Sequence, residues 1–203
     1  MAGSFPSKLV ASHNILELGF NITSAISHPT IMLMNSGRIG HENEDFYFYK
    51  EGISIENANI IRVLDEDRQR IGQLYGLTLP SYLELMNRFY DFKCDSYYEF
   101  FTRSPVHNKL KLCPPSVDYR YLSQDVPFII LPWYNLGLRA GYDSKVMRSI
   151  IELSSLLNGA DYSACGRRLA DHIFSDMSLD EVSDFVTYGA VSAMKPSKLD
   201  KAS

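Results

Sequence analysis

Residues 54–76 constrain the fold most, because they have the pattern of one long amphipathic helix. Ser54 is a typical helix-starting N-cap, Glu56 places negative charge in the first turn, and Gly76 is a typical helix end. The apolar residues at helical spacing are Ile60, Ile61, Leu64, Ile71 and Leu74. Such a helix must bury its apolar face against other elements of the chain.

The same periodicity recurs along the sequence, whereas patterns typical of β-strands are few. Further helices are expected over 81–91, 96–102, 121–138, 144–157, 161–174 and 179–188. Three prolines in 104–119 predict an ordered loop, and Gly141 predicts a break. We therefore expect an all-α fold, a compact domain of about seven or eight helices. It should span 14–190, between an N-terminal segment (1–13) and a polar, frayed C-terminal tail (191–203).

The helix predicted over 54–76 has charged residues of both signs in its middle. Asp65, Asp67, Arg68 and Arg70 are spaced so that neighbouring turns can pair opposite charges. The sequence predicts that they form a solvated face with local ion pairs.

Composition excludes several classes of function. The net charge of −4 and the scattered Lys and Arg residues argue against binding to nucleic acid. The three cysteines form no Cys-x-x-Cys pair, so neither a disulfide framework nor a zinc site is indicated, and a reducing, cytoplasmic location is expected. No signal peptide is evident, and no apolar run reaches the roughly 20 residues of a membrane helix. The acidic run 41–45 lacks a helical pair of histidines, so no metal site is expected.

Two separated segments carry candidate chemistry. His28 lies in the apolar run 27–33, and Arg120 and Asp125 lie in the run 120–127. An imidazole transfers protons near neutral pH, a carboxylate can orient it, and a guanidinium binds a substrate carboxylate through two parallel hydrogen bonds. Simpler interpretations exist: His28 as a helix-start residue, and Arg120 and Asp125 as a structural ion pair or a helix cap.

A series of short pieces, taken in order, resembles the C-terminal, substrate-binding domain of the octopine/nopaline (opine) dehydrogenase family. They are Asn14–Leu16, His28–Pro29, Asn35–Ile39, Phe46–Gly52, Leu64–Arg68, Arg120–Leu122, Asp125–Pro127 and Gly166–Leu169. The resemblance implies a helical fold like the C-terminal domain of phosphogluconate dehydrogenase. It also implies reductive condensation of an amino acid with a 2-oxo acid.

The resemblance assigns roles to three residues. His28 corresponds to the family's proton-transfer histidine, Asp125 to its carboxylate partner, and Arg120 to the arginine that contacts substrate carboxylate. Gln124 and Asp67 depart from the family's usual glutamates. Family members bind NAD(H) or NADP(H) mainly through an N-terminal Rossmann domain. Since no Gly-x-Gly-x-x-Gly loop occurs here, this chain is expected to need such a domain or subunit and to be inactive alone.

Two alternatives stay open. The same three residues would also suit simple carbonyl reduction by a 2-hydroxy acid dehydrogenase. Alternatively, the chain is a helical small-molecule-binding or dimerising module that has lost its enzymatic activity; a homodimer is possible in either case, because apolar surface left by a missing partner promotes self-association.

Overall fold

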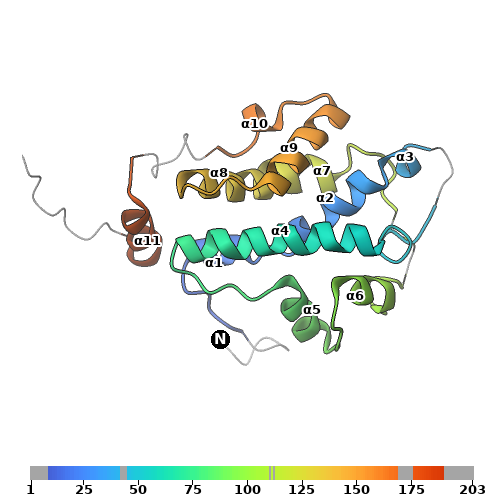
Figure 1. Ribbon diagram of the computed structural model, residues 1–203, viewed down its shortest axis with the longest axis horizontal. Helices are drawn as coiled ribbons and strands as arrows, with labels where there is room; N and C mark the ends of the chain where they lie inside the picture. Colours follow the sequence, from blue (N-terminus) through green and yellow to red (C-terminus); the bar gives the residue numbers. More distant parts are fainter. Residues whose placement is uncertain (1–8, 42–44, 110, 112, 169–175, 190–203) are drawn as a thin grey trace, which may run out of the picture.

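The computed structural model describes residues 9–41, 45–109, 111, 113–168 and 176–189. All regular secondary structure in these residues is helical, so the predicted all-α fold is confirmed. Helix α4 (Ile55–Leu74) crosses the middle of the molecule (Figure 1). The other elements are α1 (Ile15–Phe20), α2 (Ser24–Met34), α3 (Ser36–Ile39), α5 (Tyr82–Tyr90), α6 (Tyr97–Arg103), α7 (Arg120–Ser123), η2 (Val126–Ile130), α8 (Leu131–Arg139), α9 (Lys145–Asn158), α10 (Tyr162–Cys165) and α11 (Leu179–Tyr188). The chain therefore forms more and shorter helices than the periodicity predicted.

Helix α4 is the centre of the packing. Helices α5 and α6 lie on one side of it, and α8, α9 and α10 lie on the other (Figure 1). It contacts α1, α2, α6, α8 and α9. The Ser54 hydroxyl caps its start by accepting a hydrogen bond from the Asn57 backbone N–H (3.2 Å), and Gly76 follows its end with φ +74°. The sequence thus predicted both ends of α4 correctly.

Two charged residues of α4 lie in the core, which contradicts the prediction of a solvated face. Asp65 and Arg68 are completely buried, and an Arg68 Nη2 lies 2.7 Å from an Asp65 carboxylate oxygen. Arg70 is exposed as predicted, whereas Asp67 accepts hydrogen bonds from the hydroxyls of Tyr142 (2.6 Å) and Ser144 (2.5 Å).

The buried pair is stabilised by bonds to three other segments. Asp65 accepts hydrogen bonds from the Tyr82 backbone N–H and the Tyr97 hydroxyl, both at 2.7 Å. Arg68 donates to the backbone carbonyls of Phe20 (3.1 Å) and Pro80 (2.5 Å). The pair therefore satisfies groups at the end of α1 and the start of α5 that would otherwise be buried without partners.

The apolar run predicted as one helix over 121–138 is broken into α7, η2 and α8. The backbone N–H of Leu131 donates to the carbonyl of Val126, five residues earlier, and Pro132 has no backbone N–H. The Pro127 carbonyl therefore has no hydrogen-bond donor within the helix. That carbonyl accepts a hydrogen bond from the Arg167 N–H (2.9 Å). The π-helical turn η2 begins immediately after Asp125, and this backbone conformation helps to set the position of the Asp125 carboxylate.

Predictions near the ends have mixed outcomes. The helix expected over 161–174 is reduced to α10, because the backbone becomes extended at Gly166. Residues 169–175 of that prediction lie outside the described residues, as do residues 1–8 of the N-terminal segment and the whole tail 191–203. Helix α11 forms as predicted and begins with a capping box between Ser178 and Glu181.

The described residues also bear on the excluded classes of site. The three cysteines, all of them described, form no disulfide. No described helix is long and apolar enough to span a bilayer. Where the structure describes the chain, no group of three His, Cys, Asp or Glu side chains could hold a metal ion; residues 42–44 of the acidic run are outside that part.

Candidate functional site

His28 lies in the middle of α2, so its interpretation as a helix-start residue is wrong. Helix α2 packs against α4, α7, α9 and η2, and most of its residues are buried. The His28 side chain is 12% exposed, which leaves a small part of the imidazole open. The buried apolar residues on both sides of His28 hold α2 in the core, and this packing sets the position of the imidazole.

The structure brings His28 and Asp125 together. His28 Nδ1 lies 2.9 Å from one carboxylate oxygen of Asp125, and the Ser24 hydroxyl lies 3.5 Å from the other. Asp125 precedes η2 but makes no side-chain capping bond, so its interpretation as a helix cap is wrong. Because a carboxylate only accepts hydrogen bonds, Nδ1 carries the proton in the neutral imidazole. We call this pair of side chains the dyad.

The other ring nitrogen of His28 contacts a residue that the sequence analysis did not single out. His28 Nε2 lies 2.9 Å from the hydroxyl of Tyr49, which is buried. Burial, with a smaller contribution from Tyr121, raises the pKa of Tyr49 well above its usual value, so the phenol keeps its proton. The run Phe46–Gly52 belongs to the resemblance, but nothing in the sequence distinguishes Tyr49 from Tyr47 within it.

Tyr121 covers one face of the imidazole. The two rings are stacked, with centroids 3.7 Å apart and planes inclined by 22°. Tyr121 is the second residue of α7, and burial raises the pKa of its hydroxyl. Aromatic stacking on the imidazole keeps the His28 ring from rotating.

Arg120 is the first residue of α7, and its side chain is exposed. Its side chain makes no hydrogen bond or ion pair with another described residue, so the structural ion pair considered above is not formed within the described part of the chain. It lies next to Tyr121 in sequence, and its charge partly offsets the rise in the pKa of Tyr121 that burial causes. An exposed guanidinium next in sequence to the tyrosine that stacks on His28 is suited to bind a carboxylate from solvent.

The turn over residues 48–52 positions Tyr49. The Gly52 carbonyl accepts a hydrogen bond from the Asn35 side chain (2.8 Å), and the Lys50 N–H donates to the Asn108 side chain (3.1 Å). A Cβ added at Gly52 would lie 2.2 Å from the Phe48 carbonyl oxygen and 2.9 Å from a methyl of Ile31. Only glycine allows the turn to approach α2 this closely.

Gly52→Ala should therefore destabilise the chain by about 1 to 3 kcal/mol, since the added methyl meets backbone that cannot move aside cheaply. Gly37→Ala is the matched control, because nothing lies within 4 Å of a Cβ at that position. Urea denaturation monitored by circular dichroism measures both changes. Equal midpoints for the two variants would show that the turn has room for a side chain.

His107 contributes a pH dependence to folding. Its ring meets the Tyr49 ring edge-on (centroids 4.8 Å apart), and its Nδ1 lies 2.8 Å from the Ser104 hydroxyl. Burial, followed by the charge of nearby His28, lowers the pKa of His107 from 6.5 to about 4. Between these two values the unfolded chain binds a proton that the folded chain does not, so stability falls as the pH falls through this window.

His107→Asn should remove that loss while keeping a polar group near Ser104. Between pH 7 and pH 4 the variant should lose about 1 to 2 kcal/mol less stability than the unmodified chain, a value reduced for solvent screening of the partly exposed ring. Urea denaturation at several pH values tests this. His13→Asn is the control, because His13 is exposed. If the free energy of unfolding depends on pH in the same way in the His107 variant and in the control, His107 has the same pKa in the folded and unfolded chains.

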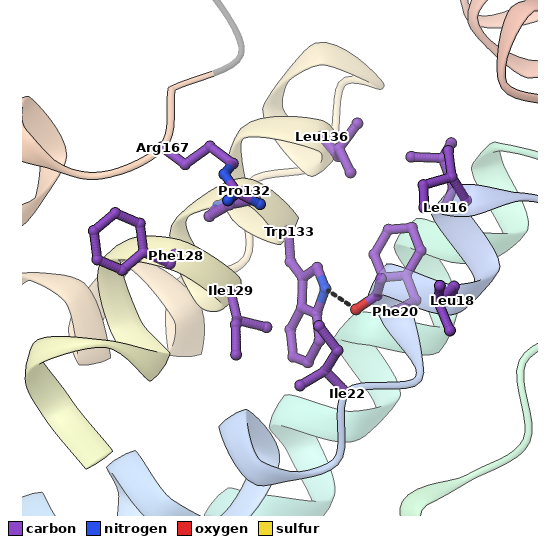
Figure 2. A pocket seen from close by; sticks show the side chains of 12 residues that line it. Leu16, Leu18, Phe20, Ile22, Phe128, Ile129, Pro132, Trp133, Leu136 and Arg167 are labelled. Carbon is purple, nitrogen blue, oxygen red and sulfur yellow. Dashed lines mark hydrogen bonds between the residues drawn. The ribbon is translucent and has the colours of Figure 1, made fainter. Parts of the chain in front are cut away.

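An apolar groove of about 560 Å³ lies between α1 and the η2–α8 segment (Figure 2). Trp133 and Phe20 form its floor, and the Trp133 indole N–H donates a hydrogen bond to the Gly19 carbonyl (3.2 Å). Its rim includes Ile22 and Phe128, which are both exposed. Ile22 precedes the start of α2, which carries His28, and Phe128 is on η2, which follows Asp125, so the groove and the dyad lie on neighbouring segments of the chain.

Comparisons with known proteins identify the family of this chain. The sequence profile of the NAD/NADP octopine/nopaline dehydrogenase α-helical domain matches residues 11–158. Protein ocs of Agrobacterium tumefaciens (strain Ach5) is 23% identical over 167 residues, which are 82% of this chain and 46% of the relative. Vitopine synthase of Allorhizobium ampelinum is 26% identical over 169 residues, with the same coverage of 82% and 46%.

Solved structures show the same fold. Octopine dehydrogenase with NADH and L-arginine superimposes with a TM-score of 0.67 at 16% identity, over 87% of this chain and 50% of that one. The structure of octopine dehydrogenase with NADH and agmatine gives a TM-score of 0.64 over the same shares of each chain. The chain thus spans about half the length of the relatives that it matches. It belongs to the NAD/NADP octopine/nopaline dehydrogenase family, of which it carries the α-helical domain.

Proposed function

We propose that this chain is the substrate-binding and proton-transfer half of an NAD(P)-dependent opine dehydrogenase. The reaction condenses an amino acid with a 2-oxo acid, and reduction of the resulting imine gives a secondary amine dicarboxylate. The observation that carries the proposal is the bond between His28 and Asp125, two residues far apart in sequence, in a chain of this family. Structures of a relative with NADH and L-arginine, and with NADH and pyruvate, support the substrate classes.

The dyad suits the proton chemistry of this reaction. Starting from an ammonium group, condensation and reduction release one water and consume one proton in each turnover. His28 can supply that proton and recover it from solvent, because an imidazole exchanges protons near neutral pH. Asp125 fixes the tautomer and stabilises the imidazolium while His28 is charged. Arg120 would bind the carboxylate of the oxo acid and orient its carbonyl toward the dyad.

The nicotinamide would be held mainly by a second domain or subunit. When bound, this cofactor supplies the hydride for the reduction. The chain has no glycine-rich phosphate loop, while its groove and dyad lie on adjoining elements, as expected of a surface that a partner domain covers. Under this proposal the isolated chain is inactive, and full activity requires the partner.

The test is oxidation of NADH or NADPH by the chain alone and by the chain joined to or mixed with a Rossmann polypeptide of the same family. Pyruvate and other 2-oxo acids are supplied with and without amino acids, including L-arginine. Turnover that needs both the partner and both substrates supports the proposal. Turnover without the amino acid would instead indicate a 2-hydroxy acid dehydrogenase, and no turnover by any mixture would contradict both.

The apolar groove favours a second candidate function, a small-molecule-binding or dimerising module without catalysis. Exposed Ile15, Leu18, Ile22 and Phe128 border it, and an apolar surface of this kind favours association. Sedimentation of the chain alone discriminates between the candidates. A tight dimer that Phe128→Asp dissociates, together with an absence of turnover by every mixture, would support the module.

A further inference from the structure

Both nitrogens of the His28 ring are bonded within the chain. Nδ1 lies 2.9 Å from Asp125, and Nε2 lies 2.9 Å from the Tyr49 hydroxyl. With the proton of the neutral ring on Nδ1, the lone pair of Nε2 faces Tyr49. A proton that His28 exchanges with a substrate therefore uses the nitrogen to which Tyr49 is bonded.

A tyrosine hydroxyl suits this position because it can both donate and accept a hydrogen bond. It donates to Nε2 when the imidazole is neutral, and it accepts from the Nε2 proton when the imidazole is charged. Phenylalanine could do neither. The hydroxyl thus satisfies a ring nitrogen in a mostly buried site in both states of a proton-transfer histidine.

Rings on several sides fix the position of Tyr49. Its ring is parallel to that of Phe101 with centroids 5.8 Å apart, and it meets the edges of Phe48 (5.1 Å) and His107 (4.8 Å). This packing keeps the Tyr49 hydroxyl within hydrogen-bond distance of His28 Nε2.

We propose that Tyr49 acts together with the dyad, and that its hydroxyl holds His28 Nε2 and relays the proton between that nitrogen and the substrate. When His28 gives up its proton, Tyr49 gains one from Nε2 and passes its own to the substrate. The Tyr49 oxygen gains one proton and loses one, so no phenolate remains. The relay to a substrate rests on the proposed function, whereas the bond to Nε2 does not.

The bond is tested on this chain alone by ¹⁵N NMR of its histidine rings, with His28→Gln used to assign the His28 signals. In Tyr49→Phe the unprotonated Nε2 signal should move downfield, because it loses its hydrogen-bond donor, while Asp125 keeps the proton on Nδ1. Tyr98→Phe is the matched control, since Tyr98 is an exposed tyrosine of α6. An Nε2 signal that is the same in Tyr49→Phe and Tyr98→Phe would overturn the proposal.

The relay is tested by steady-state kinetics of the enzyme completed by its Rossmann partner. Tyr49→Phe should lower kcat by about 10-fold or more with little change in KM, because the ring remains in place and only the hydroxyl is lost. Unchanged kcat in this variant would overturn the relay. If the unmodified enzyme shows no turnover, the proposed function fails, and the relay with it, while the Nε2 signal still decides whether Tyr49 holds His28.

Discussion

His28→Ala and Asp125→Asn should each lower the turnover of the completed enzyme by about 100-fold or more while leaving the helical fold intact. The first variant removes the proton-transfer group. The second keeps the size of the side chain but replaces the carboxylate, which only accepts hydrogen bonds, with an amide, which can also donate. The tautomer of His28 is then no longer fixed, and the charged imidazolium loses its counter-ion.

The measurement is kcat for oxidation of NADH or NADPH with a 2-oxo acid and an amino acid, with circular dichroism to verify folding. His13→Ala is the matched control, because His13 is exposed and distant in sequence from the dyad. The double variant should be no slower than the slower single variant, since the two residues act as one unit. Near-normal turnover in either single variant would remove the dyad from the mechanism.

Arg68→Met should lower the free energy of unfolding by about 3 to 5 kcal/mol, enough to unfold a domain of ordinary stability. The substitution nearly keeps the volume of the side chain but leaves the Asp65 carboxylate buried without its counter-ion. It also removes the donors to the Phe20 and Pro80 carbonyls, so the contacts of α4 with the end of α1 and the start of α5 weaken together.

Arg62→Met provides the control on the same helix. Arg62 pairs with Glu66 one turn away, but both side chains are largely exposed, so its loss should cost about 0.5 kcal/mol or less. Urea denaturation of both variants gives the comparison. If Arg68→Met costs no more than Arg62→Met, the buried pair contributes nothing beyond an ordinary surface ion pair.

The sequence indicated the reactive residues of the site but not the whole site. Residue type and resemblance indicate His28, Asp125 and Arg120, and the structure brings the first two into contact and leaves the third exposed on α7. Tyr49 was missed, because it lies in an aromatic run where apolar packing and hydrogen bonding look alike in sequence. Its hydroxyl has a distinct role only because the turn over 48–52 aims it at Nε2.

The fold shows a similar division. Periodicity and caps located α4, α5, α6, α9 and α11, since these are local properties of a few neighbouring turns. The predicted helices 121–138 and 161–174 were too long, because their interruption depends on one contact between distant residues. That contact is the hydrogen bond from the Arg167 N–H to the Pro127 carbonyl, a carbonyl without a donor inside its own helix.

The sequence by itself determined the helical class of this chain, the ends of its central helix and the residue types available for proton transfer, because these follow from local spacing and side-chain chemistry. Only the tertiary structure decided which charges are buried and which polar groups meet. Asp65 and Arg68 carry the same spacing signal as a surface pair, yet they lie in the core where α1 and α5 offer them backbone partners. Burial of a charge depends on partners from distant segments, and local sequence does not record them.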